Sequence, residues 1–91
     1  MEEIERIVKS INRKGALKVL NLLAEKKEMK FNDIARAVGF SSMAGRVLKD
    51  FRKLGIVTKR DLKDNLGTVH YSLTEKGMKL KDILEQMKRL N

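Results

Sequence analysis

A chain of 91 residues has room for one small domain with one hydrophobic core, and we predict a single domain over residues 1–91. Hydrophobic residues make up 42% and charged residues 36% of the chain, which is typical of a folded, mostly helical domain. The absence of cysteine excludes disulfides, thiolate metal sites and cysteine nucleophiles. The N-terminus does not show a basic leader before an apolar stretch, and no apolar run approaches the ~20 residues that cross a bilayer. We therefore expect a cytoplasmic protein with no membrane partner.

The net charge of +9 is unevenly distributed along the chain. Residues 1–30 carry +3, residues 31–60 carry +5 and residues 61–91 carry +1. The middle third therefore holds seven basic and only two acidic side chains. Such a concentration of positive charge favours a polyanion as partner, although lysine-rich surfaces also serve solubility.

Two helices are predicted before residue 28. Residues 3–12 form a short amphipathic helix, because their apolar side chains follow the i, i+3, i+4, i+7 spacing of one helical face. That face consists of Ile4, Ile7, Val8 and Ile11. A second helix, over residues 14–27, is apolar around more than half its circumference, so we expect it to be the most buried helix. Residues 13–15 between them form either a kink or a break.

Two closely spaced helices follow, after a short edge strand predicted over residues 29–31. The first covers residues 32–38 and the second covers residues 41–54. Gly39 permits the sharp turn between them, because it has no β-carbon to resist it. Two helices joined by so short a connector cross steeply, which is the helix-turn-helix arrangement.

The second of these helices separates apolar from basic side chains when it is phased at 100° per residue. One side is the expected buried stripe, formed by Ala44, Val47, Leu48, Phe51 and Leu54. The other side presents Ser42, Gly45, Arg46, Lys49 and Lys53. Arginine can bind guanine bidentately in the major groove, lysine can neutralise phosphate, and glycine allows a nucleic-acid strand to approach closely. The alternative is an ordinary solvated basic face.

A hairpin and a last helix complete the predicted elements. Gly55 suits the left-handed conformation that ends a helix. The strands of the hairpin cover residues 56–60 and 68–73, and residues 61–67 form a polar turn. The last helix, over residues 74–90, begins at Thr74 as N-cap. Its apolar stripe consists of Leu80, Ile83, Leu84 and Met87.

Few side chains are candidates for catalysis or metal binding. His70 alternates to the outer face of its strand, where we expect it to face solvent or a phosphate. Asp61 and Asp64 lie in the predicted turn without a third carboxylate in register. The hydroxyls of Ser41 and Ser42 have no neighbouring base, so we interpret them as N-caps of the second helix, as Asn32 is of the first. We predict no enzyme, no cofactor and no metal site.

The order of these elements resembles that of the winged-helix transcription regulators, most closely the HxlR-like and MarR-like groups. The resemblance covers residues 11–79. It is carried by the segments Lys14-Gly15-Ala16-Leu17-Lys18-Val19-Leu20, Phe31-Asn32-Asp33-Ile34-Ala35, Leu48-Lys49-Asp50-Phe51, Leu54-Gly55-Ile56-Val57 and Tyr71-Ser72-Leu73-Thr74-Glu75-Lys76-Gly77. It implies an α+β winged helix-turn-helix fold, mainly helical with a small β-hairpin, and extra N- and C-terminal helices.

The resemblance also implies a function as a homodimeric repressor or activator that binds double-stranded DNA. Helix 41–54 would enter the major groove, and the wing over residues 56–73 would follow the flanking backbone or minor groove. The expected DNA-binding residues are Asn32, Ser41, Ser42, Gly45, Arg46, Lys49, Lys53, Lys59, Arg60, Lys63, Asn65, Thr68 and His70. HxlR-like members often carry an N-terminal sensing cysteine, which this chain lacks, and the sequence does not identify a small-molecule effector.

The terminal helices leave two interpretations open. Their apolar stripes could close over the one core, or they could form a homodimer interface, which we favour because a winged helix is complete without them. The expected interface residues are Ile4, Ile7, Val8, Ile11, Leu80, Ile83, Leu84 and Met87. Two functional alternatives to a sequence-specific regulator also remain, namely an architectural protein that coats DNA and a winged helix that docks onto another protein.

Overall fold

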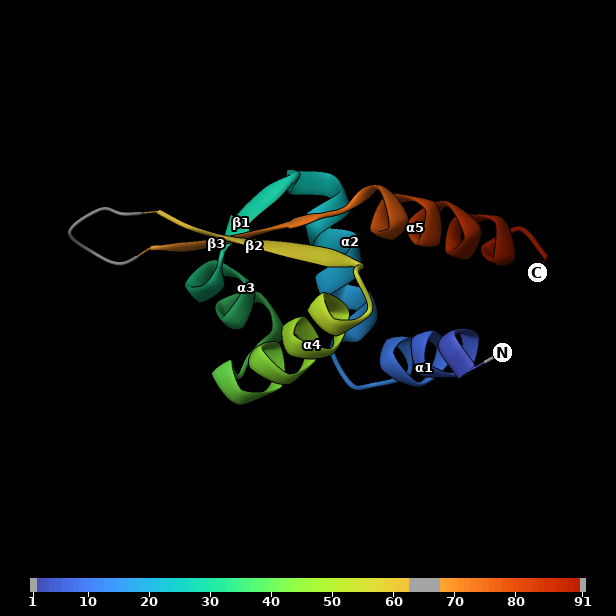
Figure 1. Ribbon diagram of the computed structural model, residues 1–91, viewed down its shortest axis with the longest axis horizontal. Coiled ribbons are helices and arrows are strands. Elements are labelled where there is room, and N and C mark those ends of the chain that lie inside the picture. Colours follow the sequence, from blue (N-terminus) through green and yellow to red (C-terminus); the bar gives the residue numbers. More distant parts are fainter. Residues whose placement is uncertain (1, 63–67, 91) are drawn as a thin grey trace.

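A three-stranded antiparallel sheet lies against a set of helices in the computed structural model, which describes residues 2–62 and 68–90 (Figure 1). The strands are β1 (Glu28–Lys30), β2 (Val57–Asp61) and β3 (Val69–Leu73). The strand order is β1-β3-β2, so β3 is central. The predicted edge strand and hairpin are therefore confirmed, with small shifts of their ends.

Five helices are seen in the described residues, and all were predicted. They are α1 (Glu2–Ile11), α2 (Ala16–Lys26), α3 (Phe31–Val38), α4 (Ser41–Lys53) and α5 (Glu75–Lys88). The connection between α1 and α2 is a break, because Gly15 adopts a left-handed φ of 86° immediately before α2. The α+β class and the winged-helix order of elements agree with the prediction.

One apolar cluster holds the helices and the sheet together. Helix α4 contributes the predicted stripe, of which Phe51 is completely buried. The other large, fully buried side chains are Val19, Leu20, Leu23, Ile34, Val47, Leu48 and Ile56. Each such side chain stabilises the folded state by about 1.5–3 kcal/mol through the apolar surface it removes from water. The orientation of α4 is thus determined by its buried face.

Two predicted helix caps are wrong. Lys30, whose side chain makes no capping hydrogen bond, is the N-cap of α3, so Asn32 lies inside the first turn of the helix. Lys30 also pairs with His70 in the sheet, so the chain passes directly from a strand into the helix and leaves no extended residue at position 32. Similarly, Phe40 has the extended N-cap conformation of α4, so Ser41 and Ser42, the two predicted caps of this helix, are already helical.

The junction between α4 and α5 is closely packed. Gly55 has the predicted left-handed φ, here 75°, and Thr74 is the predicted N-cap of α5, because its Oγ1 accepts a hydrogen bond of 3.1 Å from the Gly77 amide. The Thr74 hydroxyl also donates to the Gly55 carbonyl, and Lys76 Nζ donates to the Leu54 carbonyl at 2.7 Å. The turn that ends α4 is therefore bonded to the first turn of α5.

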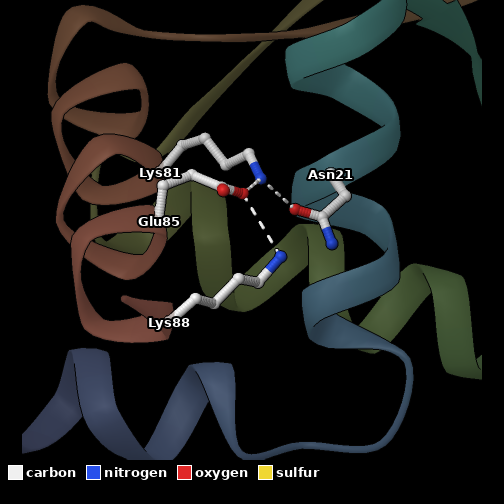
Figure 2. Close-up of polar contacts among 4 residues, drawn as sticks. All are labelled: Asn21, Lys81, Glu85 and Lys88. Atoms are coloured by element: carbon white, nitrogen blue, oxygen red, sulfur yellow. Dashed lines mark hydrogen bonds and ion pairs between the residues drawn. The ribbon is translucent and has the colours of Figure 1, made fainter. Parts of the chain in front are cut away.

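Polar contacts join α5 to α2 farther along the helix (Figure 2). Lys81 Nζ donates to Asn21 Oδ1 at 2.6 Å and also pairs with Glu85, which Lys88 approaches to 3.3 Å. The hydrogen bond from Lys81, followed by that from Lys88, lowers the pKa of the Glu85 carboxyl. The network therefore holds one side of α5 against α2.

The apolar stripes of the terminal helices divide into two groups. Four of the eight expected interface residues, Ile7, Ile11, Leu80 and Leu84, pack against the core of the same chain. The other four, Ile4, Val8, Ile83 and Met87, remain exposed. The core interpretation is thus confirmed for half of each stripe, and the dimer interface stays a prediction that now rests on the exposed half.

The close approach at Gly77 yields a stability prediction. A β-carbon built there lies 2.2 Å from the Ile56 carbonyl oxygen, whereas one built at Gly45 meets nothing within 4 Å. We expect Gly77→Ala to lower the free energy of unfolding by about 1–3 kcal/mol, because the backbone at Ile56 or Gly77 must shift to make room for the added methyl group. The matched variant Gly45→Ala should raise it by up to about 1 kcal/mol through helix propensity.

Urea denaturation at one fixed protein concentration measures both effects. An unfolding midpoint of Gly77→Ala equal to that of the wild type would contradict the packing argument.

Candidate nucleic-acid interface

Helix α4 presents its basic side to solvent. The side chains of Ser42, Arg46, Lys49 and Lys53 are exposed, while the opposite stripe lies in the core. The phase predicted from the sequence is therefore confirmed. No other part of the described chain covers this surface, which we call the α4 basic face and define by Ser42, Gly45, Arg46, Lys49 and Lys53.

The positive charge of the α4 basic face is not neutralised within the described chain. Arg46, Lys49 and Lys53 form no ion pair with any residue in the described ranges. Asp50 is the acidic residue of the same helix, and its Oδ2 lies 2.9 Å from Nε of Arg13 in the α1–α2 connection. The helix thus directs its one carboxylate away from the basic face and into an ion pair.

Gly45 has no structural reason to be glycine in the described chain. Its φ is not in the left-handed region, and a β-carbon at this position would point into open space. Glycine in a helix costs about 1 kcal/mol relative to alanine. The missing side chain therefore leaves a depression in the basic face, and the helix is less stable than it would be with alanine at this position.

Strand β2 extends the basic surface beyond α4. Lys59 pairs with Tyr71 in the sheet, and both line a hollow beside the first turn of α3. The same hollow brings together three of the predicted DNA-binding residues, Asn32, Lys59 and Thr68. The wing and the first turn of α3 therefore form one surface.

Lys59 also borders a second hollow, which lies between β2 and the last turn of α4. Its other basic residues are Lys49, Arg52 and Lys53. Arg52 was not predicted as part of the interface, because the phase of α4 places it at the margin between its buried and basic sides. Its spacing of three residues from Lys49 was the available signal, since residues at i and i+3 are neighbours on a helix.

Two predicted contact residues point to the other face of the sheet. Successive side chains of a strand alternate between faces, so Arg60 is directed away from Lys59. Arg60 Nη2 lies 2.7 Å from Glu28 Oε1, and His70 Nδ1 lies 2.9 Å from the same oxygen. The expectation that His70 faces solvent is wrong, because its side chain is only 15% exposed.

Glu28 thus links all three strands. The hydrogen bond from Arg60 is the main reason why the pKa of Glu28 lies below its usual value, and the contact with His70 lowers this pKa further. The carboxylate therefore stays charged at neutral pH and holds Arg60 on the sheet. The predicted contacts Lys63 and Asn65 lie outside the described residues.

The base of the wing is held by two aromatic side chains. The rings of Phe31 and Tyr71 are 6.3 Å apart between centroids and are tilted by 51°. Burial raises the pKa of the Tyr71 hydroxyl, so this group remains neutral beside the basic surface. The packing connects β3 to α3 and fixes the side from which the wing projects (Figure 1).

Two other features are not seen in the part of the chain that the structure describes. Across residues 2–62 and 68–90, no cluster of three or more histidine, aspartate or glutamate side chains has the arrangement of a metal site. In the same ranges, no helix is both long and apolar enough to cross a bilayer.

The described chain combines a helix-turn-helix, an exposed basic face and a hairpin that continues it, which defines a winged helix-turn-helix protein. The family model of HxlR-like helix-turn-helix proteins matches residues 3–91. The chain therefore belongs to the HxlR-like helix-turn-helix family, and the predicted resemblance is confirmed.

Solved structures show the same fold. The reduced form of the transcriptional regulator YodB from B. subtilis is similar over 98% of this chain and 88% of that chain, at 21% identity and a TM-score of 0.83. A homodimeric winged helix-turn-helix DNA-binding domain from Mycobacterium bovis is similar over 97% of this chain and 80% of that chain, at 22% identity and a TM-score of 0.80. A transcriptional regulator homologue from Pyrococcus horikoshii OT3 is similar over 99% and 94% of the two chains, at 18% identity and a TM-score of 0.79. A comparison with curated protein sequences found no match.

Proposed function

We propose that this protein is a transcriptional regulator that binds specific sites on double-stranded DNA as a homodimer. Helix α4 would enter the major groove, and the wing would lie along the flanking backbone or minor groove. The observation that supports this proposal is the α4 basic face, which is exposed and free of acidic partners among the described residues. A winged helix can also coat DNA without sequence preference, and tighter binding to an enriched site than to random duplex distinguishes the two functions.

The residues of the proposed contact surface have different tasks. Arg46 is suited to read guanine through two parallel hydrogen bonds, and Lys49 is suited to neutralise a phosphate or reach the same base edge. Lys53, Arg52 and Lys59 would contact phosphates toward the wing. Arg60 and His70 are held by Glu28, so we leave them outside the proposed surface.

The proposed dimer uses the exposed halves of the terminal stripes. In Figure 1, α1 and α5 lie at the right end of the molecule with both termini, whereas the hairpin projects to the left. Ile83 and Met87 are each more than half exposed. The similar domain from Mycobacterium bovis is homodimeric, which supports the same assembly here. A two-fold dimer would bring two recognition helices to major grooves ~34 Å apart, and so favour a palindromic site.

Substitution of the basic face tests the proposed DNA binding. We expect Arg46→Ala to reduce affinity for an enriched site by about 1–3 kcal/mol and to relax specificity at one base pair. A plot of log affinity against log salt concentration has a negative slope. Lys49→Ala should make this slope shallower by about one unit, because one fewer counterion is released. The control Lys26→Ala removes a lysine from the end of α2, which borders none of the hollows near α4 or the wing.

Fluorescence-anisotropy titrations with an enriched duplex and with random duplex give all of these values. A regulator should bind the enriched site ~10³-fold or more tightly than random duplex, whereas an architectural protein should bind both alike. If neither Arg46→Ala nor Lys49→Ala changes affinity or its salt dependence, the proposed function is wrong.

Gly45 offers a test that separates stability from binding. We expect Gly45→Ala to bind the enriched duplex at least tenfold more weakly although the variant folds more stably, because the added methyl group would occupy the space of the approaching DNA. Gly45→Ser should weaken binding further through its larger side chain. Parallel anisotropy and urea measurements check the two quantities, and unchanged affinity of Gly45→Ala would show that the DNA does not approach this position.

The dimer is tested by charges placed on the exposed stripe of α5. The double variant Ile83→Asp and Met87→Asp should raise the dimer dissociation constant by about 100-fold or more, since two apolar side chains per protomer would lose their burial. Met78→Asp is the matched control, because Met78 is also exposed on α5 but is turned about 140° from Ile83 and 180° from Met87 at 100° per residue. Sedimentation velocity over a range of protein concentrations measures the change, and equal effects of the two substitutions would argue against this interface.

A further inference from the structure

An exposed aromatic side chain stands at the start of the recognition helix. Phe40 is 64% exposed, although phenylalanine is among the residues most often buried. It lies between Gly39 and Ser41, in the turn that joins α3 to α4. Nothing in the core of the described chain explains its apolar ring, and the basic-face interpretation does not use it.

The backbone holds Phe40 at this position. The amide of Gly39 donates to the Ala35 carbonyl at 2.8 Å, which ends α3, and the Ala44 amide donates to the Phe40 carbonyl at 3.1 Å, which starts α4. Phe40 therefore has an extended N-cap conformation between two helices that are both anchored in the core. These two hydrogen bonds hold the backbone from which the ring projects.

Phe40 borders a hollow of about 280 Å³ beside the first turn of α4. Its other lining residues are Arg13, Lys14, Ser42, Met43 and Arg46. Met43 is seated against the α1–α2 connection, because a β-carbon at Gly15 would lie 2.8 Å from its sulfur atom. The hollow thus combines an apolar ring and a fixed thioether with cationic side chains.

The charges of this hollow favour an anionic occupant with an apolar group. Arg13 is paired with Asp50, whereas Lys14 and Arg46 have no ion pair with the described residues. Arg46 belongs to the α4 basic face, so the hollow continues the proposed DNA-binding surface. The N-terminal residues of a recognition helix are those that reach base edges in the major groove.

We propose that Phe40 is a specificity-determining residue that contacts the 5-methyl group of a thymine in the major groove. This inference rests on the proposed function and adds to it. Thymine carries the only apolar group on the major-groove edges of the four bases, and phenylalanine is one of the side chains that contact it. Arg46 and Ser42 then lie beside the neighbouring base pair, and Lys14 lies toward the phosphate backbone.

The test compares thymine with deoxyuridine, which differs only by the methyl group. Duplexes that bind the wild-type protein are first enriched from a random pool, and each thymine of the enriched duplex is then replaced singly by deoxyuridine. We expect one replacement per half-site to weaken wild-type binding about fourfold, the effect of removing one buried methyl group. Replacements elsewhere should have no effect.

Variants of Phe40 assign this effect to its side chain. Phe40→Ala should bind the thymine and deoxyuridine duplexes equally, whereas Phe40→Leu should still prefer thymine because it keeps an apolar contact. Arg46→Ala should weaken binding to both duplexes while keeping the thymine preference. Urea midpoints of the Phe40 variants should match the wild type, since the ring is exposed.

The possible outcomes separate this inference from the proposed function. If the wild type enriches a site but no deoxyuridine replacement weakens binding, or if Phe40→Ala retains the preference, the thymine contact is overturned while specific DNA binding stands. If Phe40→Ala instead changes the oligomeric state, the ring belongs to a subunit contact and the inference is also overturned. If the wild type enriches no site, the proposed function fails and the thymine contact fails with it.

Discussion

The close approach of Gly77 to the Ile56 carbonyl is the constraint on which the arrangement of the two functional ends depends. It lets the turn after α4 pack directly on the first turn of α5, where Thr74 caps the helix and Lys76 binds the last carbonyl of α4. This junction sets where the end of α4 lies relative to the start of α5, the helix proposed for dimerisation.

The ion pairs of the acidic side chains near α4 are a second feature of the structure. Three acidic side chains near the proposed interface are each engaged by a basic partner: Asp50 with Arg13, Asp33 with Arg36, and Glu28 with Arg60. Burial is the main reason why the pKa of the Tyr71 hydroxyl is raised, and the nearby charge of Asp61, at the end of β2, raises it further. These surface pairs contribute little stability, typically below about 1 kcal/mol each. Their main consequence is that these three carboxylates are engaged away from Arg46, Lys49 and Lys53, which have no acidic partner among the described residues.

The molecule is elongated, with extents of 46 × 24 × 22 Å, and its chemistry changes along the long axis (Figure 1). The hairpin lies at one end, and the exposed apolar residues of α1 and α5 lie at the other. This separation would allow the proposed apolar contact between subunits and the proposed contact with DNA to form together. Each terminal stripe is divided, since one half packs against the core and the other half remains on the surface.

The sequence by itself determined the order of elements, the buried stripe of α4 and the identity of its basic face, because helical periodicity and charge are local properties. It also predicted Gly55 as a left-handed turn and Thr74 as an N-cap, since both depend on neighbouring residues. The caps assigned to Asn32 and Ser41 were wrong, because strand pairing of Lys30 and the extended conformation of Phe40 move the helix starts. Only the tertiary structure decided that Glu28 holds His70 and Arg60 away from the basic surface, and that Arg52 is part of that surface. It also decided that packing requires glycine at position 77 but not at position 45. Those outcomes depend on contacts between residues far apart in the chain, which no local pattern specifies.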